Sequence, residues 1–286
     1  MPIGGQAVIE GVMLHDGQRA VVAVRTPQGQ VAVEPLPTTL SLPRLESIPF
    51  IRGPIKLVQM LALGWAALQR SASLAHPEEA PASRWEFLTV ILFVVVILVG
   101  GFMLLPAYLV GLANIGNRIV FNLVEGGVRV TLFLGYLGAI SFLPDIRRVF
   151  QYHGAEHKVV HAHEEGDASV QGARGRSPIH PRCGTSFLLL FVVVAILVFS
   201  LLPTTNLGVR LLGRVLLLPV VAGLTYEILR FGSRHPRAWW LQPLLVPGLL
   251  LQRFTTRQPS DDQIEVALAA LRYLTDDKAR SLSTTA

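Results

Sequence analysis

Long apolar runs dominate the chain. The run from Leu88 to Leu105 contains no charged residue, and its length suffices to cross the roughly 30 Å hydrocarbon core of a bilayer. Three further apolar runs are Ile119 to Leu143, Phe187 to Leu202 and Leu211 to Phe231. This pattern predicts a mainly α-helical integral membrane protein with about four transmembrane helices, paired as one hairpin over 85–143 and a second over 186–232.

The segment before the first apolar run has a different pattern. Residues 6–14 and 20–36 contain short β-branched and alternating runs, which are typical of strands. Pro27-Gln-Gly29 divides the second stretch, as a hairpin turn would. We therefore expect a small N-terminal β-rich segment within 1–43.

Two kinds of helix are predicted outside the apolar runs. Pro54 suits the first turn of a helix, and the apolar part of this helix is too short to span a bilayer. Residues 44–84 are therefore expected to form an interfacial or re-entrant helix. Residues 233–286 should contain a membrane-surface segment that includes Trp239, followed by a C-terminal helix capped by Ser260.

The composition agrees with a membrane protein. The chain is 51% hydrophobic and 15% charged, whereas ordinary soluble domains carry about 25% charged residues. Arginines that flank the apolar runs explain the net charge of +6. Since no basic surface with interleaved aromatic residues is evident, we expect no nucleic-acid partner. A single cysteine excludes an intrachain disulfide, and the N-terminus has no signal-peptide pattern.

The distribution of Lys and Arg predicts the orientation in the membrane. These residues are concentrated in the N-terminal region, in residues 144–185 and in the C-terminal region. The positive-inside rule places such segments in the cytosol. We expect a multi-pass protein of the plasma membrane with cytosolic N- and C-termini, a cytosolic His-rich loop over 144–185, and membrane lipids around its spans.

A histidine-rich stretch interrupts the apolar chain and contains the motif His153-x-x-Glu156-His157. This order is the one found in inverzincins. Two histidines at i and i+4 can hold one Zn²⁺, and the glutamate between them can act as a general base on water. We therefore expect a divalent cation, with zinc as the best match, bound by His153 and His157, and a catalytic role for Glu156.

The third ligand of this expected site stays open. If the stretch is helical, the side chains at 153, 156, 157, 161 and 164 project into one sector. The candidates for the third ligand are His161, Glu164, His180 and Cys183. Burial of Cys183 as a small apolar residue is an alternative to ligation. The alternative for the whole stretch is a solvated helix beside the membrane, in which the His and Glu side chains only form hydrogen bonds.

Several ionisable residues interrupt apolar segments and need partners. Glu125 and Arg129 have the i, i+4 spacing of a helical ion pair. Glu227 could pair with Arg230, or it could have a function inside the membrane. Glu10 lies between glycines in an apolar stretch and needs either an arginine or the metal cluster as its partner.

The chain resembles the YqhQ family of bacterial membrane proteins, which is named for a domain of unknown function. Four stretches carry this resemblance: Gly4-Gly-Gln-Ala-Val-Ile-Glu-Gly-Val-Met13, Tyr152-His-Gly-Ala-Glu-His-Lys158, His180-Pro-Arg-Cys-Gly-Thr-Ser-Phe187 and Thr255-Thr-Arg-Gln-Pro-Ser-Asp-Asp-Gln-Ile-Glu265. The chain departs from the family pattern at Leu14-His15, usually methionine and arginine, and at Gln258, usually glutamate. The resemblance implies a metal-dependent enzyme and no established substrate.

Three functions are compatible with these features. The leading hypothesis is a metal-dependent hydrolase at the cytosolic membrane face, acting on a lipid-linked or membrane-protein substrate. The second is an oligomeric transport or channel protein, in which a homo-oligomer surrounds a pathway lined by the intramembrane charges. The third is a non-catalytic membrane scaffold with a structural metal that closes residues 153–183 on themselves.

Overall fold

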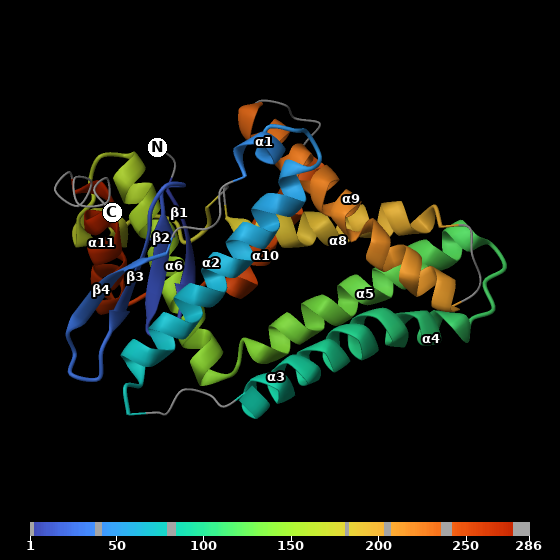
Figure 1. Ribbon diagram of the computed structural model, residues 1–286, viewed down its shortest axis with the longest axis horizontal. Coiled ribbons are helices and arrows are strands. Elements are labelled where there is room, and N and C mark those ends of the chain that lie inside the picture. The colour runs from blue at the N-terminus through green and yellow to red at the C-terminus, as the bar shows by residue number, and fades with distance from the viewer. Residues whose placement is uncertain are drawn as a thin grey trace.

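A computed structural model describes residues 3–37, 42–78, 84–180, 183–202, 207–235 and 242–276. The described part is mainly helical and contains a small antiparallel sheet near the N-terminus. Figure 1 shows the sheet and its covering helices at one end of the molecule, with long helices extending away from them. Trp239, Trp240 and Arg182 lie outside the described residues, so the expected membrane-surface segment is described only from Gln242 onward.

The sheet contains four consecutive antiparallel strands in the order β1-β2-β3-β4. Their bounds are Gly4–Val8, Gly11–His15, Ala20–Arg25 and Val31–Leu36. The predicted hairpin at Pro27-Gln-Gly29 is confirmed, with Gly29 at φ +80°. The stretch 6–14, in contrast, is not one strand. Val8 pairs with Gly11, so the chain reverses direction at Ile9-Glu10. Glu10 adopts a left-handed backbone conformation there, with φ at 52°.

Both faces of the sheet are buried, which explains why β2 and β3 are apolar at nearly every position. Val12, Leu14, Val21 and Ala23 belong to a core shared with helices α6 and α11. Their neighbours along the strands point the other way, and Met13 and Val22 pack with Leu63 and Ala67 of helix α2. Successive side chains in a strand alternate between the two faces of the sheet. Because they are apolar on both faces, helices cover the sheet on each side.

The helices follow in chain order, with one π-helical stretch, η1. Their bounds are α1 Pro43–Glu46, α2 Arg52–Ala75, α3 Arg84–Val96, η1 Ile97–Leu104, α4 Leu105–Gly111, α5 Arg118–Ile140, α6 Pro144–Glu164, α7 Val170–Arg174, α8 Gly184–Ser200, α9 Leu207–Arg234, α10 Gln242–Thr255 and α11 Asp261–Thr275. The predicted helix after Pro54 corresponds to α2. The predicted cap at Ser260 is confirmed, because its side chain and that of Gln263 form a capping box at the start of α11.

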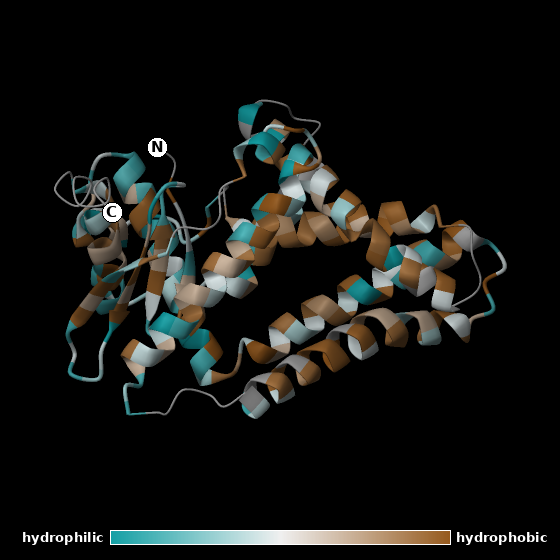
Figure 2. Cartoon of the chain, viewed as in Figure 1, coloured by the Kyte–Doolittle hydropathy of each residue, from teal (hydrophilic) through white to brown (hydrophobic). Residues whose placement is uncertain are grey.

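Three described helical segments are long and apolar enough to cross a membrane: Leu88–Gly111, Ile119–Ile140 and Leu212–Gly232. The fourth expected span appears as a shorter apolar helix, Phe187–Ser200. Figure 2 shows that these helices, which extend away from the sheet, are coloured as apolar over much of their length. Many of their large side chains are exposed, for instance Phe93 at 63%. An exposed apolar surface of this extent is what a lipid-facing helix requires.

Charged groups inside the helical bundle compensate one another. Glu125 is buried and accepts hydrogen bonds from Arg129 at 2.7 Å and from Arg214 at 2.9 Å and 2.8 Å. The predicted pair of Glu125 and Arg129 is therefore confirmed, with Arg214 of α9 as a partner that the spacing did not indicate. Glu227 pairs with Arg52 of α2 at 2.5 Å, and this pair joins α9 to the sheet-covering helix.

Glu125→Gln should destabilise the bundle, because it removes the carboxylate that compensates two guanidinium groups. Removing one partner of a buried ion pair costs about 3–5 kcal/mol, because the other charge stays buried without compensation. We expect a lower midpoint of thermal unfolding in detergent for Glu125→Gln, and a smaller loss for the double variant Glu125→Leu, Arg214→Leu. The exposed Thr131→Val on the same helix serves as the control. Equal midpoints for Glu125→Gln and the parent protein would contradict the structural role of this cluster.

Candidate metal centre

Helix α6 carries the histidine motif and begins directly after the apolar helix α5. Pro144 occupies the first turn, where its missing amide donor costs least, and Gly166 at φ +81° follows its end. Within the segment 144–185, a helix of 21 residues forms the first half and carries the histidine motif. One side of α6 packs on the sheet through Tyr152, Ala155 and Val159, and the histidines lie on another side.

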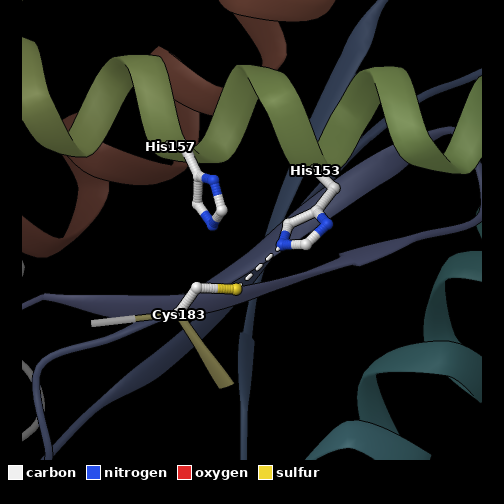
Figure 3. A group of neighbouring side chains, drawn as sticks. All are labelled: His153, His157 and Cys183. Carbon is white, nitrogen blue, oxygen red and sulfur yellow. Dashed lines mark hydrogen bonds between the residues drawn. The ribbon is translucent and has the colours of Figure 1, made fainter. Parts of the chain in front are cut away.

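His153 and His157 project from successive turns of α6 toward Cys183, as Figure 3 shows. Their ring centroids lie 4.4 Å apart, and Nε2 of His153 lies 3.2 Å from Sγ of Cys183. One ligand atom from each of the three residues lies within 4.8 Å of the other two. The structure therefore brings together the two expected histidine ligands and one of the four candidates for the third ligand.

Backbone carbonyl groups hold both imidazoles in one orientation. Nδ1 of His153 lies 2.8 Å from the carbonyl oxygen of Thr255, and Nδ1 of His157 lies 2.5 Å from that of Pro178. A carbonyl oxygen only accepts, so Nδ1 carries the proton in each ring and Nε2 carries the lone pair. Metal-binding histidines are oriented in this way. Nε2 of His157 is buried and has no hydrogen-bond partner among the described residues.

Burial disfavours charge on these three side chains. It lowers the pKa of His157 to about 3, with a further contribution from the neighbouring His153. Burial also raises the pKa of the Cys183 thiol to about 11, and the charge of Glu156 adds to this effect. Without a cation the site therefore holds two neutral imidazoles and a protonated thiol at pH 7. A bound cation would displace the thiol proton, so the donor set fits a zinc-like ion.

Glu156 is not one of these three grouped ligands. Its side chain is buried, and burial raises its pKa to about 8. The carboxyl group fits against β1 because residue 5 is glycine: a Cβ at Gly5 would lie 2.9 Å from the Glu156 carboxyl carbon. Oε2 of Glu156 has no hydrogen-bond partner among the described residues. Glu156 is close enough to Cys183 for its charge to raise the pKa of the thiol.

The other three candidate ligands form a second group. His161, Glu164 and His180 also bring one ligand atom each within 4.8 Å of one another. Glu164 Oε2 lies 3.6 Å from His180 Nε2, and the rings of His161 and His180 are 4.4 Å apart. The single site expected from the sequence therefore divides into two adjacent groups of three donors.

Residues far away in the sequence support both groups. Gln252 of α10 accepts a hydrogen bond from the amide of His180 at 2.8 Å and donates one to its carbonyl oxygen at 2.9 Å. The amide of Arg257 donates to the carbonyl of Phe150 at 2.8 Å, which brings the end of α10 alongside α6. A Cβ at Gly154 would lie 2.1 Å from the Arg257 carbonyl oxygen, so this contact requires glycine. The sequence analysis did not identify Gln252, Gly5 or Gly154 as residues that support the site.

The partner of Glu10 is an arginine and not the metal-ligand cluster. Arg148 of α6 forms an ion pair with Glu10, and the hydroxyl of Tyr152 lies 3.4 Å from the same carboxylate. Glu227 forms its ion pair with Arg52, and the charge of the expected Arg230 also acts on its carboxylate. These pairs fasten the sheet and α2 to α6 and α9.

Comparison with known proteins identifies the family. The model of the family described as "Protein of unknown function (DUF1385)" matches residues 48–277. The chain is 35% identical over 295 residues to "Uncharacterized protein YqhQ" of Bacillus subtilis (strain 168), covering 95% of this chain and 91% of that protein. This chain therefore belongs to the YqhQ-like DUF1385 family. No solved structure matches it significantly.

Glu156→Gln should change how the stability of the cation-free protein depends on pH. Burial raises the pKa of Glu156 from its ordinary 4.5 to about 8, so between these pH values the folded state retains a proton that the unfolded chain has lost. Stability contributed by the protonated carboxyl is therefore lost as pH rises from about 4.5 to 8, by on the order of 4–5 kcal/mol.

We expect thermal unfolding with a chelator present to show that Glu156→Gln gains stability relative to the parent as pH rises from 5 to 9. The exposed Glu265→Gln should follow the parent curve throughout. If the curves of Glu156→Gln and the parent ran parallel, the buried and protonated state of Glu156 would be excluded.

Proposed function

We propose that this protein is a membrane-bound, metal-dependent hydrolase whose centre is formed by His153, His157 and Cys183. The observation that carries the proposal is the orientation of the two imidazoles. Each is held through Nδ1 by a backbone carbonyl and directs Nε2 toward the thiol of Cys183. Three protein ligands leave one coordination position of a tetrahedral ion for water or substrate, as in catalytic zinc sites.

A divalent cation at this position would supply Lewis acidity and lower the pKa of a neighbouring water molecule toward neutrality. The protein's own residues would do the rest. Glu156 has a carboxyl group without a hydrogen-bond partner at Oε2 and a pKa of about 8, and a general base is most effective when its pKa is near the working pH. In its ionised form Glu156 would accept the proton of the attacking water and return it to the leaving group.

The surroundings of the centre favour a substrate at the membrane surface. Helix α6 begins where α5 ends, and α8 begins immediately after Cys183, so two of the apolar helices join directly to the segment that carries the ligands. With Phe187–Ser200 counted as a span, four spans would place the centre on the same side as both termini. The distribution of Lys and Arg favours the cytosol for that side, and a lipid-linked or membrane-protein substrate would suit this position.

A structural metal in a non-catalytic membrane scaffold is the second candidate function. The burial of His157, which is 2% exposed, favours it. In this case a cation would fasten the segment before α8 to α6, and removal of the cation would unfold the segment without loss of a chemical activity.

The two functions can be separated in water enriched in ¹⁸O, since each hydrolysis adds an oxygen atom from water to one of its two products. Purified zinc-loaded protein is incubated with a bacterial membrane extract, and mass spectrometry detects labelled lipid and peptide products. We expect labelling by the parent protein. Glu156→Gln should bind zinc equally but label at least about 100-fold more slowly, and His157→Ala should lose the zinc ion of this centre together with the labelling.

Glu265→Gln is the control variant and should behave as the parent protein. Absence of zinc from the parent would refute the metal centre. Zinc binding without labelling by the parent would favour the scaffold, and undiminished labelling by Glu156→Gln would exclude this residue as the base.

A further inference from the structure

We propose that His161, Glu164 and His180 form a second divalent-cation site, so that the chain binds two cations side by side. This inference deepens the proposed function and rests on it for the occupancy of the first centre. The second group uses none of the ligands of the first. Its members come from the last turns of α6 and from the segment that leads to α8.

The spacing of the second group matches ligands around one ion. Zinc binds imidazole nitrogen and carboxylate oxygen at about 2.0–2.2 Å, so two such ligands at a tetrahedral angle lie about 3.3–3.6 Å apart. Glu164 Oε2 and His180 Nε2 are separated by 3.6 Å. This distance is long for a direct hydrogen bond, and it is the distance expected when two ligands share a cation.

The two histidines of the second group are held in position by neighbouring residues. Nε2 of His161 lies 3.0 Å from the carbonyl oxygen of Ile179, so it carries the ring proton and leaves the lone pair on Nδ1. The backbone of His180 is bound on both sides by the buried side chain of Gln252. The carbonyl contact fixes the orientation of the His161 ring before an ion binds, as at His153 and His157 but through the other ring nitrogen. Gln252 fixes the backbone position of His180.

The two groups are adjacent but chemically different. The rings of His157 and His180 lie 5.8 Å apart, and the described residues place no shared ligand between the groups. The first group contains a thiolate donor once Cys183 has lost its proton, which favours zinc. Two imidazoles and a carboxylate also accept Mn²⁺ or Fe²⁺. The side chain of Glu164 is 38% exposed, so the second cation would exchange with solvent more readily than the first.

Metal analysis of the full-length protein in detergent tests this inference. After saturation with zinc and removal of unbound ion, we expect two zinc ions per chain in the parent, one in Glu164→Gln and one in Cys183→Ser. The control Glu165→Gln, at the neighbouring half-exposed position, should retain two. His161→Asn is a second variant of the same site and should also retain one, and circular dichroism checks that each variant is folded.

Substitution with Co²⁺ identifies which site remains. The thiolate-to-cobalt charge-transfer band should persist in Glu164→Gln and disappear in Cys183→Ser. One ion per chain that is unaffected by Glu164→Gln and His161→Asn but lost in Cys183→Ser would overturn the second site and leave the proposed function intact. One ion that survives Cys183→Ser but is lost in Glu164→Gln would instead overturn the centre on which the proposed function rests.

Discussion

The arrangement of the candidate centre depends on one constraint: the buried imidazole of His157 and the half-buried imidazole of His153 lie beside a thiol, and backbone carbonyls fix the orientation of both rings. A buried polar atom without a partner costs free energy, yet Nε2 of His157 is in this position. A cation shared with His153 and Cys183 would satisfy that atom. The same cation would offset the burial that raises the pKa of the thiol to about 11.

The rest of the fold holds this arrangement in place. The four-stranded sheet supports α6 from one side, and Gly5 leaves room there for the carboxyl group of Glu156. The end of α10 approaches α6 from another side, where Gly154 permits contact with the Arg257 carbonyl. Ion pairs such as Arg148–Glu10 and Arg52–Glu227 connect the sheet and α2 to the helices that extend away from them. The centre is thus located where a compact sheet-containing unit meets the apolar helices.

Local patterns in the sequence predicted much of this structure. The apolar runs, the hairpin at Pro27-Gln-Gly29 and the cap at Ser260 depend on neighbouring residues, so periodicity and turn chemistry suffice to find them. The reversal at Ile9-Glu10 was missed because a left-handed glutamate is uncommon in a tight turn. The fourth expected span was predicted from composition, but the helix is shorter than the other three.

The composition of the site was predicted better than its geometry. The motif identified His153 and His157, and helical periodicity suggested one sector for positions 153, 156, 157, 161 and 164. The division into two groups arises from Cys183 and His180, whose positions depend on a loop and on Gln252 of α10. Such contacts join residues far apart in the sequence, and the spacing within a motif does not contain them. The same limit applies to Arg214, the partner of Glu125.

X-ray absorption at the zinc edge of the purified, zinc-loaded protein tests the central claim most directly. The account predicts a sulfur ligand at about 2.3 Å together with imidazole nitrogens at about 2.0–2.1 Å, and loss of the sulfur signal in Cys183→Ser. Bound zinc surrounded only by nitrogen and oxygen in the parent protein, or a protein that binds no zinc, would contradict it.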